Sequence, residues 1–339
     1  MYYPPYPPNP YYNPSPYFLM QEEKRDLKRT ANSLCWTLLA AMLLMSGLVY
    51  VCKYFLSLIG YTPVDPASEF GGFTPVLYYL ATGAGYVVGL AVPPLLYFAA
   101  KRIPLTNALP FQKTGLLKTA ACVFFGSAVC MLANIPANMV VQIETFFGFS
   151  GNMPAMPLSN DIGVLILYGI TIAIIPPIVE ELLFRGMILQ SLRKYGDGFA
   201  IVVSAMLFGL YHGNFVQMVF AFIAGLVMAL VVVRTGSLWN SIIIHFINNS
   251  ISFGIEMTQR YAGDSTANTV NYVIVGVLFA LGLISLLYLL IKDKHFFRSQ
   301  PSNPLFPLSA KVGAAFANPG GIAMLLFSVS MSVYILVKY

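Results

Sequence analysis

The sequence predicts an all-α fold, a polytopic transmembrane helix bundle of about nine spans, with eight spans as the alternative. Of its 339 residues, 58% are hydrophobic and only 9% are Asp, Glu, Lys or Arg. Soluble domains carry about 25% charged residues, and one spanning helix uses about 20 apolar residues. The chain lacks the charge to cover a water-facing surface of its size, which disfavours soluble enzymes and nucleic-acid binders.

The composition divides the chain into four parts. We expect residues 1–30 to form a disordered, Pro- and Tyr-rich cytoplasmic tail, because proline removes backbone donors and favours extended structure. Residues 31–114 are expected to form N-terminal membrane spans, and residues 115–255 a membrane core that carries the polar motifs. Residues 256–339 are expected to hold C-terminal spans and a cytoplasmic linker.

Nine apolar segments follow the charged run Glu22–Arg29. They lie at about 34–59, 75–100, 115–141, 161–190, 198–213, 215–233, 237–255, 270–291 and 320–338. Gly213-Asn214 is a weak break between the fifth and sixth segments, which gives the eight-span alternative.

The basic residues predict the orientation of these spans. With a cytoplasmic N-terminus and nine crossings, 16 of the 19 Lys and Arg residues fall on the cytoplasmic side, and Lys53, Arg260 and Lys338 are the exceptions. This bias follows the positive-inside rule. We therefore expect a multi-pass protein of the cell membrane, embedded in the lipid bilayer, with its C-terminus outside.

Polar residues inside the predicted spans fall in three short motifs. These are Glu180-Glu181-xxx-Arg185, Phe208-xxx-His212 and His245-xxx-Asn249. Ionisable groups are costly inside a membrane, so each is a functional candidate. Glu181 and Arg185 are four residues apart and share a helix face, which predicts an ion pair. Glu180 points about 140° away from Arg185 and is free to face the interior of the bundle.

The motif residues are predicted to meet in one cavity near the middle of the membrane, because their depths along the spans overlap. Pro176-Pro177 is expected to loosen the helix one turn before Glu180. A carboxylate taken out of bulk water is a stronger base, so Glu180 with His212 would deprotonate a water.

The third motif suits a different task in the same reaction. His245 and Asn249, which share a helix face, would donate hydrogen bonds to the oxygen of a carbonyl under attack, with Asn248 as a possible substitute for Asn249. Phe208 is expected to pack against the second motif. The reaction implied is peptide-bond hydrolysis without a covalent intermediate.

The three motifs, in this order on membrane helices, resemble those of the CPBP (Abi) family of intramembrane CAAX proteases and bacteriocin-processing enzymes. The resemblance covers residues of about 115–255 and leaves out the N-terminal tail and the final span. It implies that Glu180 and His212 activate water, that His245 and Asn249 contact the oxyanion, and that Glu181 and Arg185 support them. The implied substrate is a membrane-associated peptide or protein.

Two alternatives remain open from the sequence. Glu180, His212 and His245 could supply one carboxylate and two imidazoles to a catalytic zinc. No His-Glu-xx-His helix is present and each ligand would come from a different span, so we expect no cofactor. The second alternative is a non-catalytic membrane protein of the same fold, with a bacteriocin immunity or regulatory role.

Overall fold

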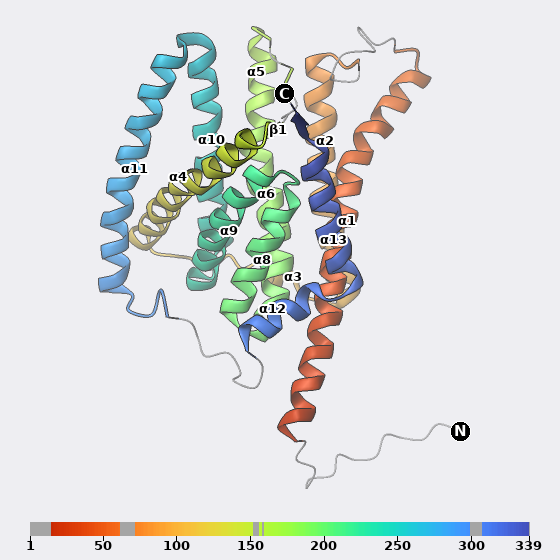
Figure 1. Ribbon diagram of the computed structural model, residues 1–339, viewed down its shortest axis with the longest axis vertical. Coiled ribbons are helices and arrows are strands. Elements are labelled where there is room, and N and C mark those ends of the chain that lie inside the picture. The colour runs from red at the N-terminus through yellow and green to blue at the C-terminus, as the bar shows by residue number, and fades with distance from the viewer. Residues whose placement is uncertain (1–14, 62–71, 152–155, 158, 299–306, 339) are drawn as a thin grey trace.

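The computed structural model describes residues 15–61, 72–151, 156–157, 159–298 and 307–338. Helices that run up and down the molecule make up nearly all of this part of the chain (Figure 1). The all-α polytopic bundle predicted from composition and apolar runs is therefore confirmed.

The helical elements follow one another with short connections. In chain order they are α1 (Pro16–Leu58), α2 (Pro75–Lys101), α3 (Leu105–Ala108), α4 (Leu116–Phe146), α5 (Ile162–Gly169), η1 (Ile170–Ile174), α6 (Ile175–Glu181), η2 (Leu182–Ile188), α7 (Leu189–Leu192), η3 (Arg193–Tyr195), α8 (Asp197–Tyr211), α9 (Phe215–Thr235), α10 (Leu238–Ala262), α11 (Asp264–Lys292), α12 (Leu308–Phe316) and α13 (Pro319–Tyr334). Each of the nine predicted apolar segments coincides with one of these helices or with an unbroken helical run.

The number of helices that cross a membrane is smaller by length and composition than the predicted nine. In the described part of the chain, six helices are long and apolar enough to cross, or seven if the bent pair α12 and α13 forms one span. Helix α8 has only 15 residues. Helix α10 has 25 residues, but polar side chains such as His245, Asn248 and Asn249 interrupt its apolar run. The count of nine, like the orientation, stays a prediction.

The run Ile162–Tyr195 is one continuous helical path with two π-helical interruptions. The first, η1, ends at Ile174, two residues before Pro176; Pro176 and Pro177 lack backbone donors and cannot continue a regular hydrogen-bond ladder. The wider π turn accommodates this break without ending the helix. Glu180 and Glu181 follow within the next turn of α6.

Residues 16–30, which we assigned to the disordered tail, instead form the first four turns of α1. Ser15 caps this helix by accepting a hydrogen bond from the Phe18 amide, and Pro16 stands at the first helical position, where proline is tolerated. The prediction was wrong for this stretch because the prolines end at Pro16, and a buried apolar residue, Leu27, anchors the helix to the bundle. Residues 1–14 of the predicted tail lie outside the described residues.

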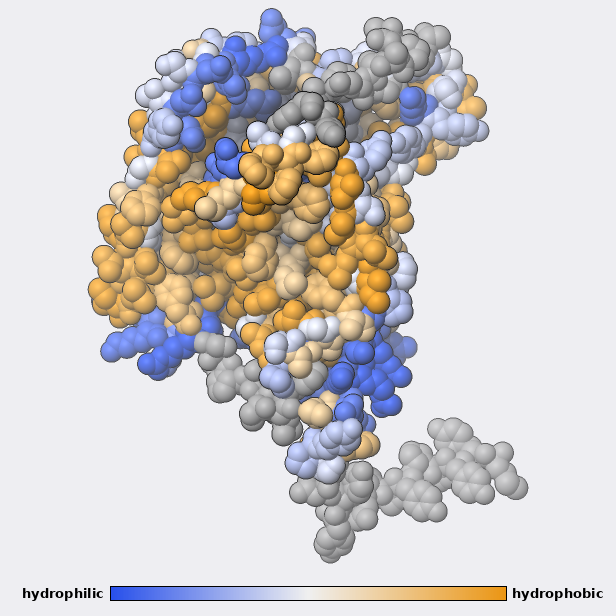
Figure 2. Space-filling model, viewed as in Figure 1, coloured by the Kyte–Doolittle hydropathy of each residue, from blue (hydrophilic) through white to orange (hydrophobic). Residues whose placement is uncertain are grey.

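Basic side chains gather at the end of the bundle that holds the turns at residues 102–115, 193–197, 235–238 and 293–298, which we call the basic end. The other end, which holds residues 147–151, 212–214 and 262–264, is the far end. Figure 2 shows hydrophilic residues at both ends of the molecule and a broad hydrophobic band between them. This distribution is the one expected of a protein that crosses a bilayer.

Ion pairs and hydrogen bonds hold the basic end together. Lys118 Nζ lies 2.8 Å from Asp293 Oδ2, and Lys194 Nζ lies 2.7 Å from Asp26 Oδ2. The fully buried Lys311 of α12 donates to the Tyr195 carbonyl and pairs with Glu23, each at 2.8 Å. The N-terminal turns of α1 and the helix α12 are thereby fixed to the end of the span that carries the first motif.

The far end is joined by a short antiparallel pair of strands, β1 (Phe149–Gly151) and β2 (Leu336–Lys338). Phe149 is opposite Lys338, and Gly151 is opposite Leu336. Strand β1 follows α4 and β2 ends the described chain, so the pair ties the C-terminal helix α13 to the α4–α5 connection (Figure 1).

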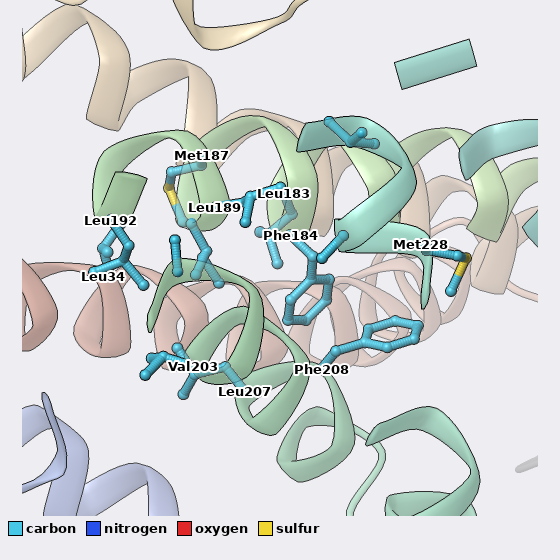
Figure 3. Close-up of a cluster of buried hydrophobic side chains, with 14 of the residues drawn as sticks. Leu34, Leu183, Phe184, Met187, Leu189, Leu192, Val203, Leu207, Phe208 and Met228 are labelled. Atoms are coloured by element: carbon cyan, nitrogen blue, oxygen red, sulfur yellow. The ribbon is translucent and has the colours of Figure 1, made fainter. Parts of the chain in front are cut away.

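The core of the bundle fills its interior toward the basic end. Leu183, Phe184 and Met187 of the first-motif span are fully buried and pack against Val203 and Leu207 of α8 (Figure 3). This cluster continues to α1 through residues such as Leu34 and Leu38. The first motif therefore lies at the edge of this apolar core, on the side that faces the far end.

Close packing of α11 on α4 depends on Gly282. A Cβ atom built there would overlap with Ala128 Cβ, whereas one built at Gly276 of the same helix would meet nothing within 4 Å. We expect Gly282→Ala to lower thermal stability, since overpacking costs about 1–3 kcal/mol. Gly276→Ala should be neutral or stabilising, because alanine is the better helix former by about 1 kcal/mol. Thermal unfolding of the detergent-purified variants measures both, and equal stability of the two would contradict the packing argument.

Candidate functional site

One polar cavity of about 640 Å³ lies inside the bundle, lined by α2, α4, the α5–α6 run, α8, α9 and α10. Of the residues predicted for the site, it brings together Glu180, Phe208, His212, His245 and Asn249 on its wall. Asn248, the possible substitute, lines it as well. Glu181 and Arg185 are not among the lining residues and lie directly behind the wall, fully buried.

Glu180 is 3% exposed and forms part of the cavity wall. Its Oε2 atom lies 3.8 Å from Nε2 of His245, so the first and third motifs meet across two helices. Its carboxylate also interacts with the Tyr211 hydroxyl, which in turn interacts with Tyr86 of α2. The carboxylate on α6 is therefore contacted by side chains of α8 and α10, and Tyr211 links it to α2.

Glu181 has a different set of partners, as its position on the helix predicted. Its Oε1 atom lies 2.9 Å from Nη1 of Arg185 and 3.1 Å from Nδ1 of His245. The guanidinium of Arg185 also reaches the Gly225 carbonyl of α9 at 3.5 Å and lies 4.4 Å from the centre of the Phe208 ring. Burying a charge without a partner costs several kcal/mol, so these contacts keep Arg185 in place.

The link from Glu181 to His245 was not predicted from the sequence. We expected Glu181 to neutralise Arg185 and His245 to act as a donor, without a contact between them. In the structure, the ionised carboxylate can only accept, so Nδ1 of His245 carries the hydrogen. Glu181 thereby fixes the ring of His245, and Nε2 is the nitrogen directed toward Glu180.

His212 is held at the C-terminal end of α8 by its own helix. Its Nδ1 atom lies 2.8 Å from the carbonyl oxygen of Phe208. A carbonyl only accepts, so Nδ1–H is the donor and Nε2 of the neutral ring carries the lone pair. The ring of Phe208 packs edge-on against both His212 and His245, at centroid distances of 5.0 and 5.9 Å. Phe208 packs against the second motif, as predicted, and its ring also contacts the imidazole of the third motif.

Asn249 of α10 is hydrogen-bonded to the π-helical turn η1. Its Nδ2 atom donates to the Ile172 carbonyl of η1 at 2.9 Å, and Asn248 Nδ2 donates to Asn249 Oδ1 at 3.3 Å. The π turn before the two prolines therefore has a partner on α10. Each amide group carries two N–H donors, so Asn249 keeps a second donor besides the one it gives to Ile172.

Tyr86 and Tyr211 belong to the site although sequence reasoning did not select them. Both stand between two glycines that are four residues apart, in Gly85-Tyr-Val-Val-Gly89 and Gly209-Leu-Tyr-His-Gly213, a pattern typical of closely packed membrane helices. The close approach is present: a Cβ at Gly89 would lie 2.5 Å from Met45 Cα, and one at Gly209 would lie 2.7 Å from the Met218 carbonyl oxygen. The position of Tyr211 directly before His212 is the signal that could have identified it.

Glu180, His212 and His245 are the three side chains that the sequence offers as zinc ligands. Across the described ranges, no group of three or more His, Cys, Asp or Glu side chains is arranged to hold a metal ion. Nδ1 of His245 and Nδ1 of His212 each donate to an acceptor, which leaves Nε2 as the nitrogen of each ring that could bind a metal, and Nε2 of His245 lies 3.8 Å from Oε2 of Glu180. The side chains as placed do not fit a three-ligand zinc site.

The helices, and the cavity with ionisable groups on its wall, define a multi-pass membrane protein. The model of the Rce1-like family, described as type II CAAX prenyl endopeptidase Rce1-like, matches residues 162–251. This segment contains all three motifs, from Glu180 to Asn249, so the family resemblance predicted from them is confirmed over this part of the chain. At the family level, the match supports a CAAX-type protease that works within the membrane. Searches of curated proteins and of solved structures each returned no match.

The pairing of Glu181 with Arg185 gives a stability test. Removing one partner of a buried ion pair costs about 3–5 kcal/mol, because the other charge is left uncompensated. We expect Glu181→Gln to lower the thermal stability of the purified protein strongly, and the double variant with Arg185→Met to recover part of the loss. Glu22→Gln, in a pair with Arg25 on the exposed start of α1, is the control and should cost less than about 1 kcal/mol. A double variant less stable than Glu181→Gln alone would count against this role.

Proposed function

We propose that the protein is an intramembrane endopeptidase that hydrolyses a peptide bond of a membrane-associated peptide or protein. The observation that carries this proposal is the convergence of Glu180, His212 and His245, from three separate helices, on one cavity inside an otherwise apolar bundle. Ionisable groups at such a depth are costly and tend to be functional. The match of residues 162–251 to a family of CAAX prenyl endopeptidases supports the same reaction class.

In the proposed reaction, Glu180 is the general base. It removes a proton from a water molecule as the water oxygen attacks the substrate carbonyl carbon, and Nε2 of His212 accepts the second hydrogen of that water as a hydrogen bond. The electrons of the carbonyl bond move to its oxygen. Glu180 then passes its proton to the amide nitrogen, the C–N bond breaks, and the products are a new carboxylic acid and a new amine.

The developing oxyanion is stabilised from α10 in this proposal. Asn249 supplies its remaining N–H. In this role His245 carries a hydrogen on both ring nitrogens, so that Nδ1–H donates to Glu181, which sets the direction of the ring, while Nε2–H donates to the oxyanion. Donors fixed in place before the reaction stabilise this charge most, because they need no reorganisation. Glu181, Arg185 and Phe208 are then positioning residues that hold these donors.

Glu180→Gln tests the assignment of the base. The amide keeps the size of the side chain but cannot accept the proton, so we expect cleavage to fall by at least about 100-fold. The measurement is mass spectrometry of new protein termini in membranes from cells that express either form, together with the yield of folded protein. Glu22→Gln, on the exposed start of α1, is the matched control and should cleave as the original does. Unchanged cleavage by Glu180→Gln would overturn the assignment and favour a non-catalytic, binding role.

We further propose that the reaction needs no metal ion, since the three candidate ligands are not arranged to hold one. The expected result is that purified protein contains zinc at well below one ion per chain, and that treatment with a chelator leaves cleavage unchanged. One bound zinc per chain, with activity lost on chelation and restored by zinc, would establish the zinc-dependent alternative.

A further inference from the structure

The cavity is not centred in the bundle but lies toward the far end. On α2, the lining residue Tyr78 is only three residues from the start of the helix and 23 residues, or about 35 Å, from Lys101 at the basic end. On α4, Asn138 is 22 residues, or about 33 Å, from Leu116 at the basic end. On α9, Gln217 is 18 residues, or about 27 Å, from Thr235.

The floor of the cavity is formed by buried residues that lie deeper. Glu180, Phe208, Met228 and His245 line it and are each less than 9% exposed. The deepest lining residues on α9 and α10, Met228 and His245, still lie seven residues, or about 10 Å, from the basic ends of their helices.

Below this floor, the apolar core separates the cavity from the basic end. Between the first motif and residues 193–197 of the same helical run, five side chains are 0% exposed and belong to the main apolar core: Leu183, Phe184, Ile188, Leu189 and Leu192. A peptide could not pass this closely packed region without unfolding it. Access from the basic end is therefore closed.

The upper wall of the cavity is polar, uncharged and partly open. Asn134 and Asn138 are four residues apart on one face of α4, and both are exposed, as is Ser252 of α10. Gln217 of α9 and Thr82 of α2 line the same space and are half-buried. Amide and hydroxyl side chains of this kind can donate to and accept from the N–H and C=O groups of a peptide main chain.

From these observations we propose that the cavity is entered from the membrane face opposite the basic loops, and that its substrate is an extended peptide segment presented at that face. This inference rests on the proposed function and specifies its substrate. An extended segment taken out of water must have its main-chain groups satisfied, and the amide-lined wall supplies partners for them. With the basic loops on the cytoplasmic side, that face is the outer one.

The Lys and Arg content of the wall indicates which part of the substrate the cavity binds. Among the lining residues that the structure describes, there is no Lys or Arg, and Arg185 is committed to Glu181 and Gly225 behind the wall. A free C-terminal carboxylate bound in this cavity would meet neither Lys nor Arg among these lining residues. The cleaved bond is thus an internal one, with apolar side chains in contact with residues such as Val216 and Phe220.

Cysteine accessibility tests the direction of access independently of catalysis. In a background where Cys35, Cys52, Cys122 and Cys130 are replaced by alanine, Asn138→Cys reports the cavity wall and Lys294→Cys, in the exposed turn after α11, reports the basic end. A membrane-impermeant maleimide should label Asn138→Cys in intact bacterial cells and Lys294→Cys only in inverted membrane vesicles. Ser252→Cys, on another helix, repeats the first measurement in case the α4 variant does not fold.

The outcomes separate this proposal from the proposed function. Labelling of the cavity cysteines only in inverted vesicles, or from the same side as Lys294→Cys, overturns the direction of access. Labelling by a permeant reagent but by neither impermeant treatment also overturns it, since the cavity is then closed to water at the far end. The same labelling is expected in a Glu180→Gln background, so a failure of catalysis leaves the pattern unchanged, and only the cleavage assay reports on the proposed function.

Discussion

The buried charge of Arg185 is the constraint on which the rest of the site depends. Its side chain is 1% exposed inside the bundle, where an unpaired cation would cost several kcal/mol. Glu181 neutralises it, the Gly225 carbonyl accepts from it, and the Phe208 ring faces it at 4.4 Å. These partners come from the first-motif span, α9 and α8, so satisfying one charge fixes the relative positions of three helices.

The same constraint separates the roles of two adjacent glutamates. Glu181 is held by Arg185 and by Nδ1 of His245, so it is a fixed acceptor. Glu180 points to the other side of the helix, onto the cavity wall, next to Nε2 of His245 and the Tyr211 hydroxyl. Because Glu181 carries the structural charge, Glu180 is left for the proton transfer that we propose. A single acid at this place could not hold Arg185 and also exchange a proton with water.

The sequence was sufficient where the structure follows from spacing along one helix. The i,i+4 relation of Glu181 to Arg185, the opposite direction of Glu180 and the break at Pro176-Pro177 all depend on local geometry, and all are present. The meeting of the three motifs in one cavity was predicted from their depths along the helices, but the individual contacts between helices were not, because they depend on packing that motif spacing does not encode. Two such contacts are the hydrogen bond from His245 to Glu181 and the interaction of Tyr86 on α2 with Tyr211. The helical residues 16–30 were missed because Pro and Tyr in the first 14 residues dominated the composition of the tail.

The bundle is closely packed near its basic end and holds a cavity of about 640 Å³ nearer its far end. A hydrolytic site within a membrane needs water, whereas a spanning bundle needs its backbone shielded and its interior filled. Here the apolar cluster around Phe184 fills the half near the basic end, while uncharged amides such as Asn134 and Asn138 keep the other half polar. Uncharged amide groups offer hydrogen-bond partners to water and avoid the desolvation cost of buried ions. Among the residues that the structure describes, the Asp, Glu, Lys and Arg side chains at the site are then limited to Glu180, Glu181 and Arg185. The polar wall and the closely packed floor are the two features behind the proposal that water reaches Glu180 from one side.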